Sequence, residues 1–118
     1  MKLADRDKKL RRSRHSEKSL ALKIQGKVQP ASGALPVAKF KGDVVNEFFM
    51  VDDKTTQAES FSVSQPLMRK TREDAFRLRR RGAICVHFES TGMRYFVISE
   101  REFLEYFQLL KVFQKFSF

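Results

Sequence analysis

The chain has one cysteine, no tryptophan and only three prolines among its 118 residues. Cys85 alone excludes an intramolecular disulfide framework and a zinc site built from several cysteines of one chain. No apolar run approaches the roughly 18 residues that cross a bilayer, and the N-terminal segment lacks the apolar stretch of a secretory signal. We therefore expect one soluble, cytoplasmic domain over residues 1–118, with a polar arm at 1–10 that frays and an aromatic extension at 107–118.

The balance of charge is strongly basic and uneven. Twenty-four Lys and Arg stand against fourteen Asp and Glu, which gives a net charge of +10 and a pI near 10.1. Residues 1–27 hold ten basic and three acidic side chains, residues 69–81 hold seven and two, and the intervening 28–68 hold three and five. Clustered basic charge indicates a polyanionic partner, most often nucleic acid, because phosphate contacts release counterions. The alternative is a solvated charged surface without a partner.

The two basic blocks supply the candidate contacts to the DNA backbone. They carry no signature of base reading. The candidates are Lys8, Lys9, Arg11, Arg12, Arg14, Arg69, Lys70, Arg72, Arg77, Arg79, Arg80 and Arg81.

Hydrophobic periodicity and turn residues predict an α/β fold in the order α-β-β-β-α-β-β-α, a mixed sheet flanked by helices. Ser64 is an N-cap candidate followed by Pro66, and Ser99 with Glu102 forms a capping box. We expect Gly82 to end the helix that Ser64 opens. The predicted helices are 3–24, 65–81 and 100–113, and the predicted strands are 27–28, 42–45, 48–56, 83–88 and 93–98, with a further extended piece at 61–63.

An acidic cluster is predicted inside this basic protein. Period-two alternation puts Asp52 and Lys54 on one face of the strand 48–56 and Asp53 on the other, so that Asp53 is the weaker candidate ligand. A turn near residues 46–47 would bring Asp43 beside Asp52. Glu17 lies on the apolar face of the first helix, where an unpaired carboxylate would cost several kcal/mol.

A divalent cation shared by Glu17, Asp43 and Asp52 would remove that cost. Hard oxygen ligands suit Mg²⁺, with Mn²⁺ as a substitute, and such a site supports phosphodiester hydrolysis. Lys54 could hold the attacking water and neutralise the transition state. Taken singly, these residues are typical of surface ion pairs and turns; the conjunction of all four indicates the site.

Together with the loop residues Pro30, Ala31, Ser32 and Gly33, these motifs resemble the PD-(D/E)xK nucleases. More narrowly they resemble the archaeal and phage Holliday-junction resolvases, whose order of motifs covers about residues 13–107. Asp52 stands where the family has glutamate, and Gly42 stands where it has proline before Asp43.

The resemblance implies a restriction-endonuclease-like fold and a homodimeric, Mg²⁺-dependent endonuclease that nicks opposing strands of four-way DNA junctions. Glu17, Asp43 and Asp52 would be metal ligands and Lys54 the catalytic lysine. Ser32 would approach the scissile phosphate, and Gln65 would be an accessory residue of the active site. The host cytoplasm would be its location if the protein is encoded by a phage. The alternatives are another nuclease of the same superfamily and a basic nucleic-acid-binding protein without catalysis.

Twelve phenylalanines are many for a 13.8 kDa chain, and several gather near the C-terminus. This aromatic pattern predicts a homodimer interface formed by Phe107, Phe113, Phe116 and Phe118. The alternatives are completion of the monomer core and contact with a host protein such as a polymerase clamp. Of the other reactive residues, we expect His87 to be a satisfied core histidine and Cys85 a small buried hydrophobe.

Overall fold

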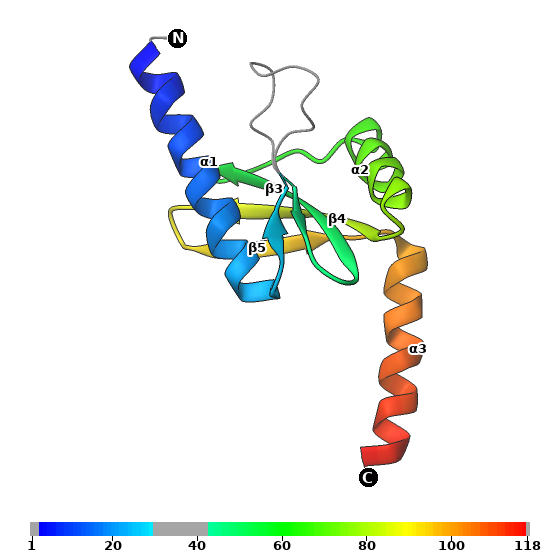
Figure 1. Ribbon diagram of the computed structural model, residues 1–118. Helices are drawn as coiled ribbons and strands as arrows, with labels where there is room; N and C mark the ends of the chain where they lie inside the picture. The colour runs from blue at the N-terminus through cyan, green and yellow to red at the C-terminus, as the bar shows by residue number, and fades with distance from the viewer. Residues whose placement is uncertain (1–2, 30–42, 118) are drawn as a thin grey trace.

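The structure is a computed structural model of the chain, described for residues 3–29 and 43–117 (Figure 1). Three helices and five strands alternate in the predicted order. The elements are α1 (Leu3–Ile24), β1 (Lys27–Val28), β2 (Val44–Val45), β3 (Phe49–Thr56), α2 (Gln65–Arg77), β4 (Arg81–Phe88), β5 (Met93–Val97) and α3 (Glu100–Ser117). The mixed α/β class is confirmed.

The strands form one five-stranded sheet in the order β1-β2-β3-β4-β5. Only β3 and β4 run parallel, and α2 connects them, whereas the other neighbours are antiparallel. The β4–β5 hairpin turns at Gly92, whose φ of 72° lies in the left-handed region that glycine adopts without penalty. A parallel pair inside an otherwise antiparallel sheet makes β3 and β4 the covered centre of the domain.

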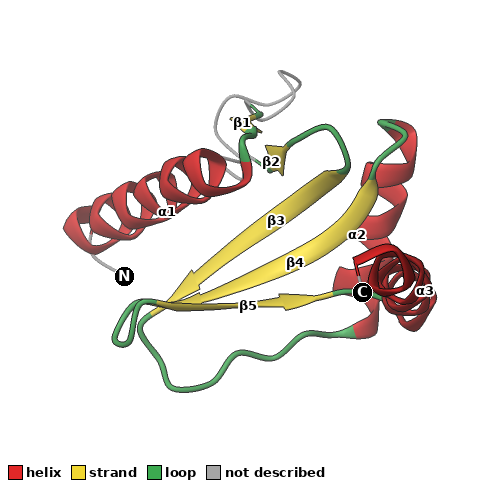
Figure 2. Ribbon diagram, turned by 90° about the horizontal axis from the view of Figure 1, so that it is seen from below, coloured by secondary structure: helices red, strands yellow, loops and turns green. Residues whose placement is uncertain are grey.

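Helices cover the two faces of this sheet (Figure 2). Leu20 and Ala21 of α1 form the buried core with Val51 and Cys85 on one face. On the other face α2 approaches β4 so closely that a Cβ at Gly82 would lie 3.0 Å from the carbonyl oxygen of Thr71. Because alternate side chains of a strand point to opposite faces, every second residue of β3 and β4 faces α1 and the residues between them face α2.

The helix predicted over 65–81 ends earlier, at Arg77. Its start is as predicted, since the Ser64 hydroxyl accepts a hydrogen bond of 3.2 Å from the amide of Leu67. Gly82 does not end the helix; it belongs to β4, where its missing side chain allows the close approach of α2. The helix ends because Arg79 adopts a left-handed φ of 56°.

Two further boundaries differ from the prediction. Residues 61–63 form no strand, and α3 continues past residue 113 to Ser117. The first two turns of α3 pack beside the start of β3, where the rings of Tyr106 and Phe49 lie 5.8 Å apart. The rest of the helix projects away from the sheet (Figure 1). Over residues 3–29 and 43–117, no helix combines the length and apolarity of a membrane span.

Candidate active site

The candidate site lies beside β3, at the point where its pairing with the described residues of β2 ends. β2 pairs with β3 only through Val44 with Val51 and Val45 with Met50. Asp43 precedes Val44, so the antiparallel register carries it to the position opposite Asp52. Past that point β3 continues to Thr56 along β4 without β2 on its other side. The turn predicted at residues 46–47 thus brings Asp43 beside Asp52 as expected.

Burial and like charge act together on Asp43. Removal from water, followed by the charges of Asp52 and Asp74, raises the pKa of Asp43 from 3.8 to about 7. Lys54 and Lys70 lower it by a smaller amount. Asp43 therefore lies within electrostatic reach of two lysines that the sequence singled out. These are Lys54 on β3, the predicted catalytic lysine, and Lys70 on α2, a predicted DNA contact.

Glu17 reaches the same cluster from α1, where it is only 4% exposed. Burial, and then the charges of Asp53, Asp43 and Asp52, raise its pKa from 4.5 to about 7. The three carboxylates predicted as ligands therefore come from three separate elements and lie within electrostatic reach of one another. Asp53 also belongs to this group, although its side chain points to the α1 face of the sheet.

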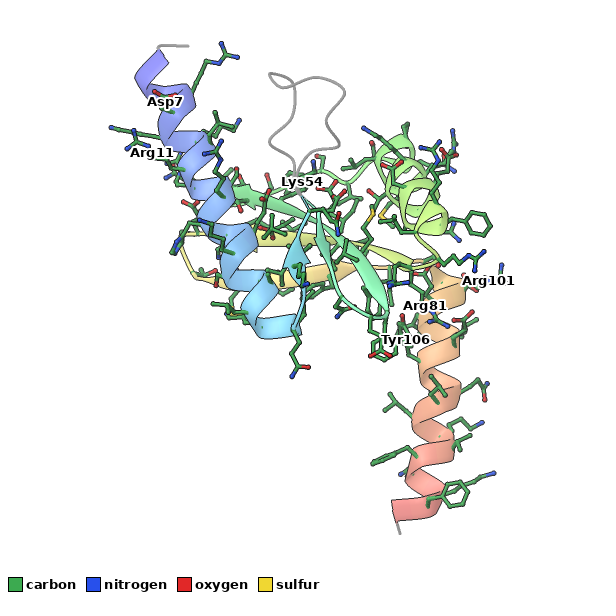
Figure 3. All side chains as sticks on the ribbon, in the orientation of Figure 1. Asp7, Arg11, Lys54, Arg81, Arg101 and Tyr106 are labelled. Atoms are coloured by element: carbon green, nitrogen blue, oxygen red, sulfur yellow. The ribbon has the colours of Figure 1, made fainter. Side chains whose placement is uncertain are left out.

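Lys54 pairs with Asp52 on the α2 face of β3, with 3.3 Å between Nζ and Oδ2. Both side chains are 14% exposed, so this ion pair is screened by solvent less than a surface pair. Figure 3 labels Lys54 at the edge of the sheet between α1 and α2. The lysine is thus held beside the acidic cluster, as alternation along the strand predicts.

A buried polar network on the α1 face was not predicted. The Ser16 hydroxyl donates a hydrogen bond of 2.5 Å to Asp53 Oδ2 and lies 2.7 Å from His87 Nδ1. Because its one hydrogen goes to Asp53, Nδ1 of His87 must be the donor in the second bond. Arg94 donates to the Ser16 carbonyl at 3.2 Å. The only sequence signal was a small polar residue beside Glu17 on an apolar helix face.

The expectation for Cys85 is confirmed, whereas His87 is hydrogen-bonded as expected but lies only partly buried at the margin of the core. Cys85 is fully buried, and burial raises the pKa of its thiol to about 12, so that it stays protonated at neutral pH. His87 is partly buried and bonded to Ser16, and burial lowers its pKa. Both side chains serve the packing of α1 on the sheet.

Two further site residues were predicted, Ser32 and Gln65. Ser32 and the rest of its loop lie outside the described residues. Gln65 is exposed at the first turn of α2 and lines a groove between α2 and α3. Among residues 3–29 and 43–117, no three His, Cys, Asp or Glu side chains are drawn together closely enough to hold a metal ion.

The donor chemistry nevertheless fits Mg²⁺ or Mn²⁺. Glu17, Asp43 and Asp52 offer carboxylate oxygens, the ligands that these hard cations prefer. Burial, and then repulsion by neighbouring carboxylates, raises the pKa values of Glu17 and Asp43, and a bound cation would relieve that repulsion. These three residues would hold the ion.

The predicted DNA-contacting residues are exposed or half-buried on α1 and around α2. Several already bind acids within the chain. Arg12 lies 3.9 Å from Glu89, Arg72 lies 3.8 Å from Glu102, and Arg81 lies 3.0 Å from Glu105. Arg80 donates to the carbonyl oxygen of Asn46 at 2.9 Å. These four have lost part of their freedom to bind phosphate, whereas Lys8, Lys9 and Arg11 are exposed on α1. Figure 3 labels Arg11 pointing away from the sheet.

No family model, no curated protein and no solved structure matches this chain.

Proposed function

We propose that this protein is a metal-dependent DNA endonuclease with the restriction-endonuclease-like arrangement of PD-(D/E)xK nucleases. The observation that supports it best is the convergence of Glu17, Asp43 and Asp52 from three elements, with Lys54 bound to Asp52 at 3.3 Å. Two of these carboxylates have pKa values raised to about 7. Such a group is costly to fold unless it binds something positive.

In this proposal Glu17, Asp43 and Asp52 hold Mg²⁺, with Mn²⁺ as a substitute. The bound metal would supply an acidified water and stabilise negative charge on phosphate oxygens. Lys54 stands beside Asp52, where its ammonium group can orient the attacking water and offset charge that develops on the phosphate. The Ser16–Asp53 bond fixes the α1 segment that carries Glu17.

The net charge of +10 supports DNA as the substrate. Four-way junctions are the preferred form of DNA because the motifs resemble those of Holliday-junction resolvases and the basic residues carry no base-reading signature. A second nuclease substrate is a linear DNA end or site, as for other members of that superfamily. Such an enzyme would act in the cytoplasm, that of the host if the protein is encoded by a phage.

A homodimer fits paired nicking, since two active sites can then act on two strands. Beyond its first turns α3 projects from the sheet (Figure 1) and exposes Phe107, Leu109, Leu110 and Phe116. We assign this surface to a second copy of the chain, because an 18-residue amphipathic helix can pair with its own copy. A clamp-like host protein is the alternative partner.

The deciding experiment compares a labelled synthetic four-way junction with a linear duplex of the same sequence, each incubated with Mg²⁺ and with EDTA. Paired nicks in the junction alone, dependent on the metal, support a resolvase. Equal cutting of both DNAs points to a general nuclease. Binding without cutting under both Mg²⁺ and Mn²⁺ contradicts catalysis and leaves a basic DNA-binding protein.

A further inference from the structure

An aromatic side chain stands exposed among arginines at the C-terminal end of α2. Phe76 is 81% exposed, and it lies in the last two turns of the helix. Four arginines follow it within five residues: Arg77, Arg79, Arg80 and Arg81. A large apolar side chain in water is unfavourable, and basic neighbours offer it no apolar cover. The catalytic proposal does not use this residue.

Phe76 lines two hollows of the surface. One hollow, of about 720 Å³, is lined by Phe76 together with the four arginines. The other, of about 710 Å³, lies between α2 and α3 and reaches back to Gln65. Phe76, Arg77, Arg80 and Arg81 line both hollows. The groove therefore follows α2 from Gln65 to the exposed ring, about 16 Å along the helix axis.

The turn after Phe76 holds its surroundings in a defined shape. The amide of Arg79 donates to the Phe76 carbonyl at 2.9 Å, and the amide of Arg80 donates to the Ala75 carbonyl at 2.9 Å. This is the Schellman arrangement, whose left-handed residue is usually glycine, but here it is Arg79 with a φ of 56°. An arginine thus occupies a position where glycine would relieve backbone strain.

The neighbouring arginines have distinct roles. The guanidinium of Arg80 is tied to the Asn46 carbonyl, and that of Arg81 to Glu105. Arg77 is more solvent-facing, with 77% of its side chain exposed and a 3.5 Å contact to Asp74 on its own helix. Arg77 and Arg79 therefore present positive charge beside the ring, while Arg80 and Arg81 brace the turn.

We propose that Phe76 is a stacking site for an unpaired nucleobase, with Arg77 and Arg79 binding the flanking phosphates. An aromatic face binds any base whose π-face is free, and adjacent cations bind its backbone. Base faces inside a continuous duplex are already stacked, so this site favours branch points and single strands. The inference deepens the proposed function, because it names how the protein would distinguish branched DNA from a linear duplex. It rests on the proposed function in one respect, that the partner is DNA.

The test measures binding in EDTA, so that cleavage plays no part. Fluorescence anisotropy gives the affinity for three probes: a four-way junction, a single strand containing 2-aminopurine, and a linear duplex. For Phe76→Ala we expect roughly 5- to 100-fold weaker binding to the junction and single strand, with duplex binding changed less than about twofold. Phe76→Trp should restore binding. Wild type should quench the 2-aminopurine, and Phe76→Ala should not.

Two matched variants complete the test. Phe96→Ala removes a half-exposed ring from β5 and should leave all three affinities unchanged. Arg79→Gly should raise the melting temperature, because glycine adopts the left-handed turn freely, yet weaken binding to all probes.

The inference is overturned if Phe76→Ala weakens duplex and junction equally, or if it leaves both unchanged and alters only the oligomeric state. Because binding is measured without metal, a wild type that never cleaves DNA but shows the Phe76 effect would refute the nuclease and keep the stacking site. If Phe76→Ala binds the junction with wild-type affinity and cleaves it, the stacking site is refuted and the nuclease is kept.

Discussion

The Ser16 hydroxyl donates a 2.5 Å hydrogen bond to Oδ2 of Asp53 from a buried position on α1, one residue before Glu17. Oδ1 of the same carboxylate has no hydrogen-bond partner among the described residues. The bond therefore supplies much of the compensation for burying Asp53, and it joins α1 to the strand that also carries Asp52. The position of Glu17 depends on it.

Replacing Ser16 by alanine should destabilise the fold. The change removes the hydroxyl that donates to Oδ2 of the buried Asp53 carboxylate, which costs about 1–3 kcal/mol. Denaturant unfolding followed by circular dichroism measures this loss as a lower midpoint. Ser13→Ala is the matched control, because Ser13 is less buried on the same helix. Equal midpoints for the two variants would contradict the role assigned to Ser16.

The metal-free protein should lose stability as the pH rises. The native pKa values of Glu17 and Asp43 are about 7, above their ordinary values of 4.5 and 3.8, so the folded chain binds more protons than the unfolded chain between about pH 4 and 7. This stabilisation is present below pH 4 and is lost as the pH rises through 7. Melting in EDTA between pH 5 and 8 should show it.

Asp43→Asn should flatten this pH dependence, since one of the two titrating carboxyls is removed. Glu59→Gln, at an exposed loop residue, should leave it unchanged. A melting temperature that rises steadily from pH 5 to pH 8 in wild type would refute the account of two buried, mutually repelling carboxyls.

Divalent metal should stabilise the fold at neutral pH. Mg²⁺ or Mn²⁺ that binds the carboxylates of the folded chain, and not of the unfolded chain, stabilises the fold by mass action. Near saturation the melting temperature should rise by roughly 5 °C. Asp52→Asn should abolish the shift. Asp74→Asn is the control, because Asp74 also acts on Asp43 but lies on α2 outside the proposed ligand set. An undiminished shift in Asp52→Asn would remove that residue from the metal site.

The exposed surface of α3 should hold two chains together. Sedimentation or light scattering should give a mass of about twice 13.8 kDa for wild type. Leu110→Glu should give the monomer mass, because it places a charge in the apolar surface. Gln108→Glu adds the same charge to the same helix and should leave the mass unchanged. A monomeric wild type would instead favour the contact with another protein.

The order of elements and most strand positions follow from the sequence because the strands alternate or run apolar, and Ser64 and Ser99 cap the helices. The Ser99 hydroxyl accepts from the amide of Glu102 at 3.2 Å as predicted, although the Glu102 carboxylate lies toward Arg72. The ends of the helices were harder to predict from the sequence. Arg79 takes the left-handed conformation without being glycine, so Gly82, the nearest conventional breaker, was chosen wrongly.

The juxtaposition of Asp43, Asp52 and Lys54 could be predicted because a short hairpin and strand alternation fix it. The contacts of Ser16 and Arg94 could not be predicted, since they join residues 37 to 78 positions apart. Such contacts depend on how α1 sits on the sheet, which local patterns do not determine.

Cleavage of a four-way junction by Asp52→Asn, beside Asp74→Asn and wild type, tests the central claim most directly. We predict at least about a 100-fold lower rate for Asp52→Asn, with junction affinity in Ca²⁺ unchanged because basic residues supply the binding. Asp74→Asn should cut at close to the wild-type rate. Cleavage by Asp52→Asn at the wild-type rate would contradict the proposed metal site, whatever the DNA substrate.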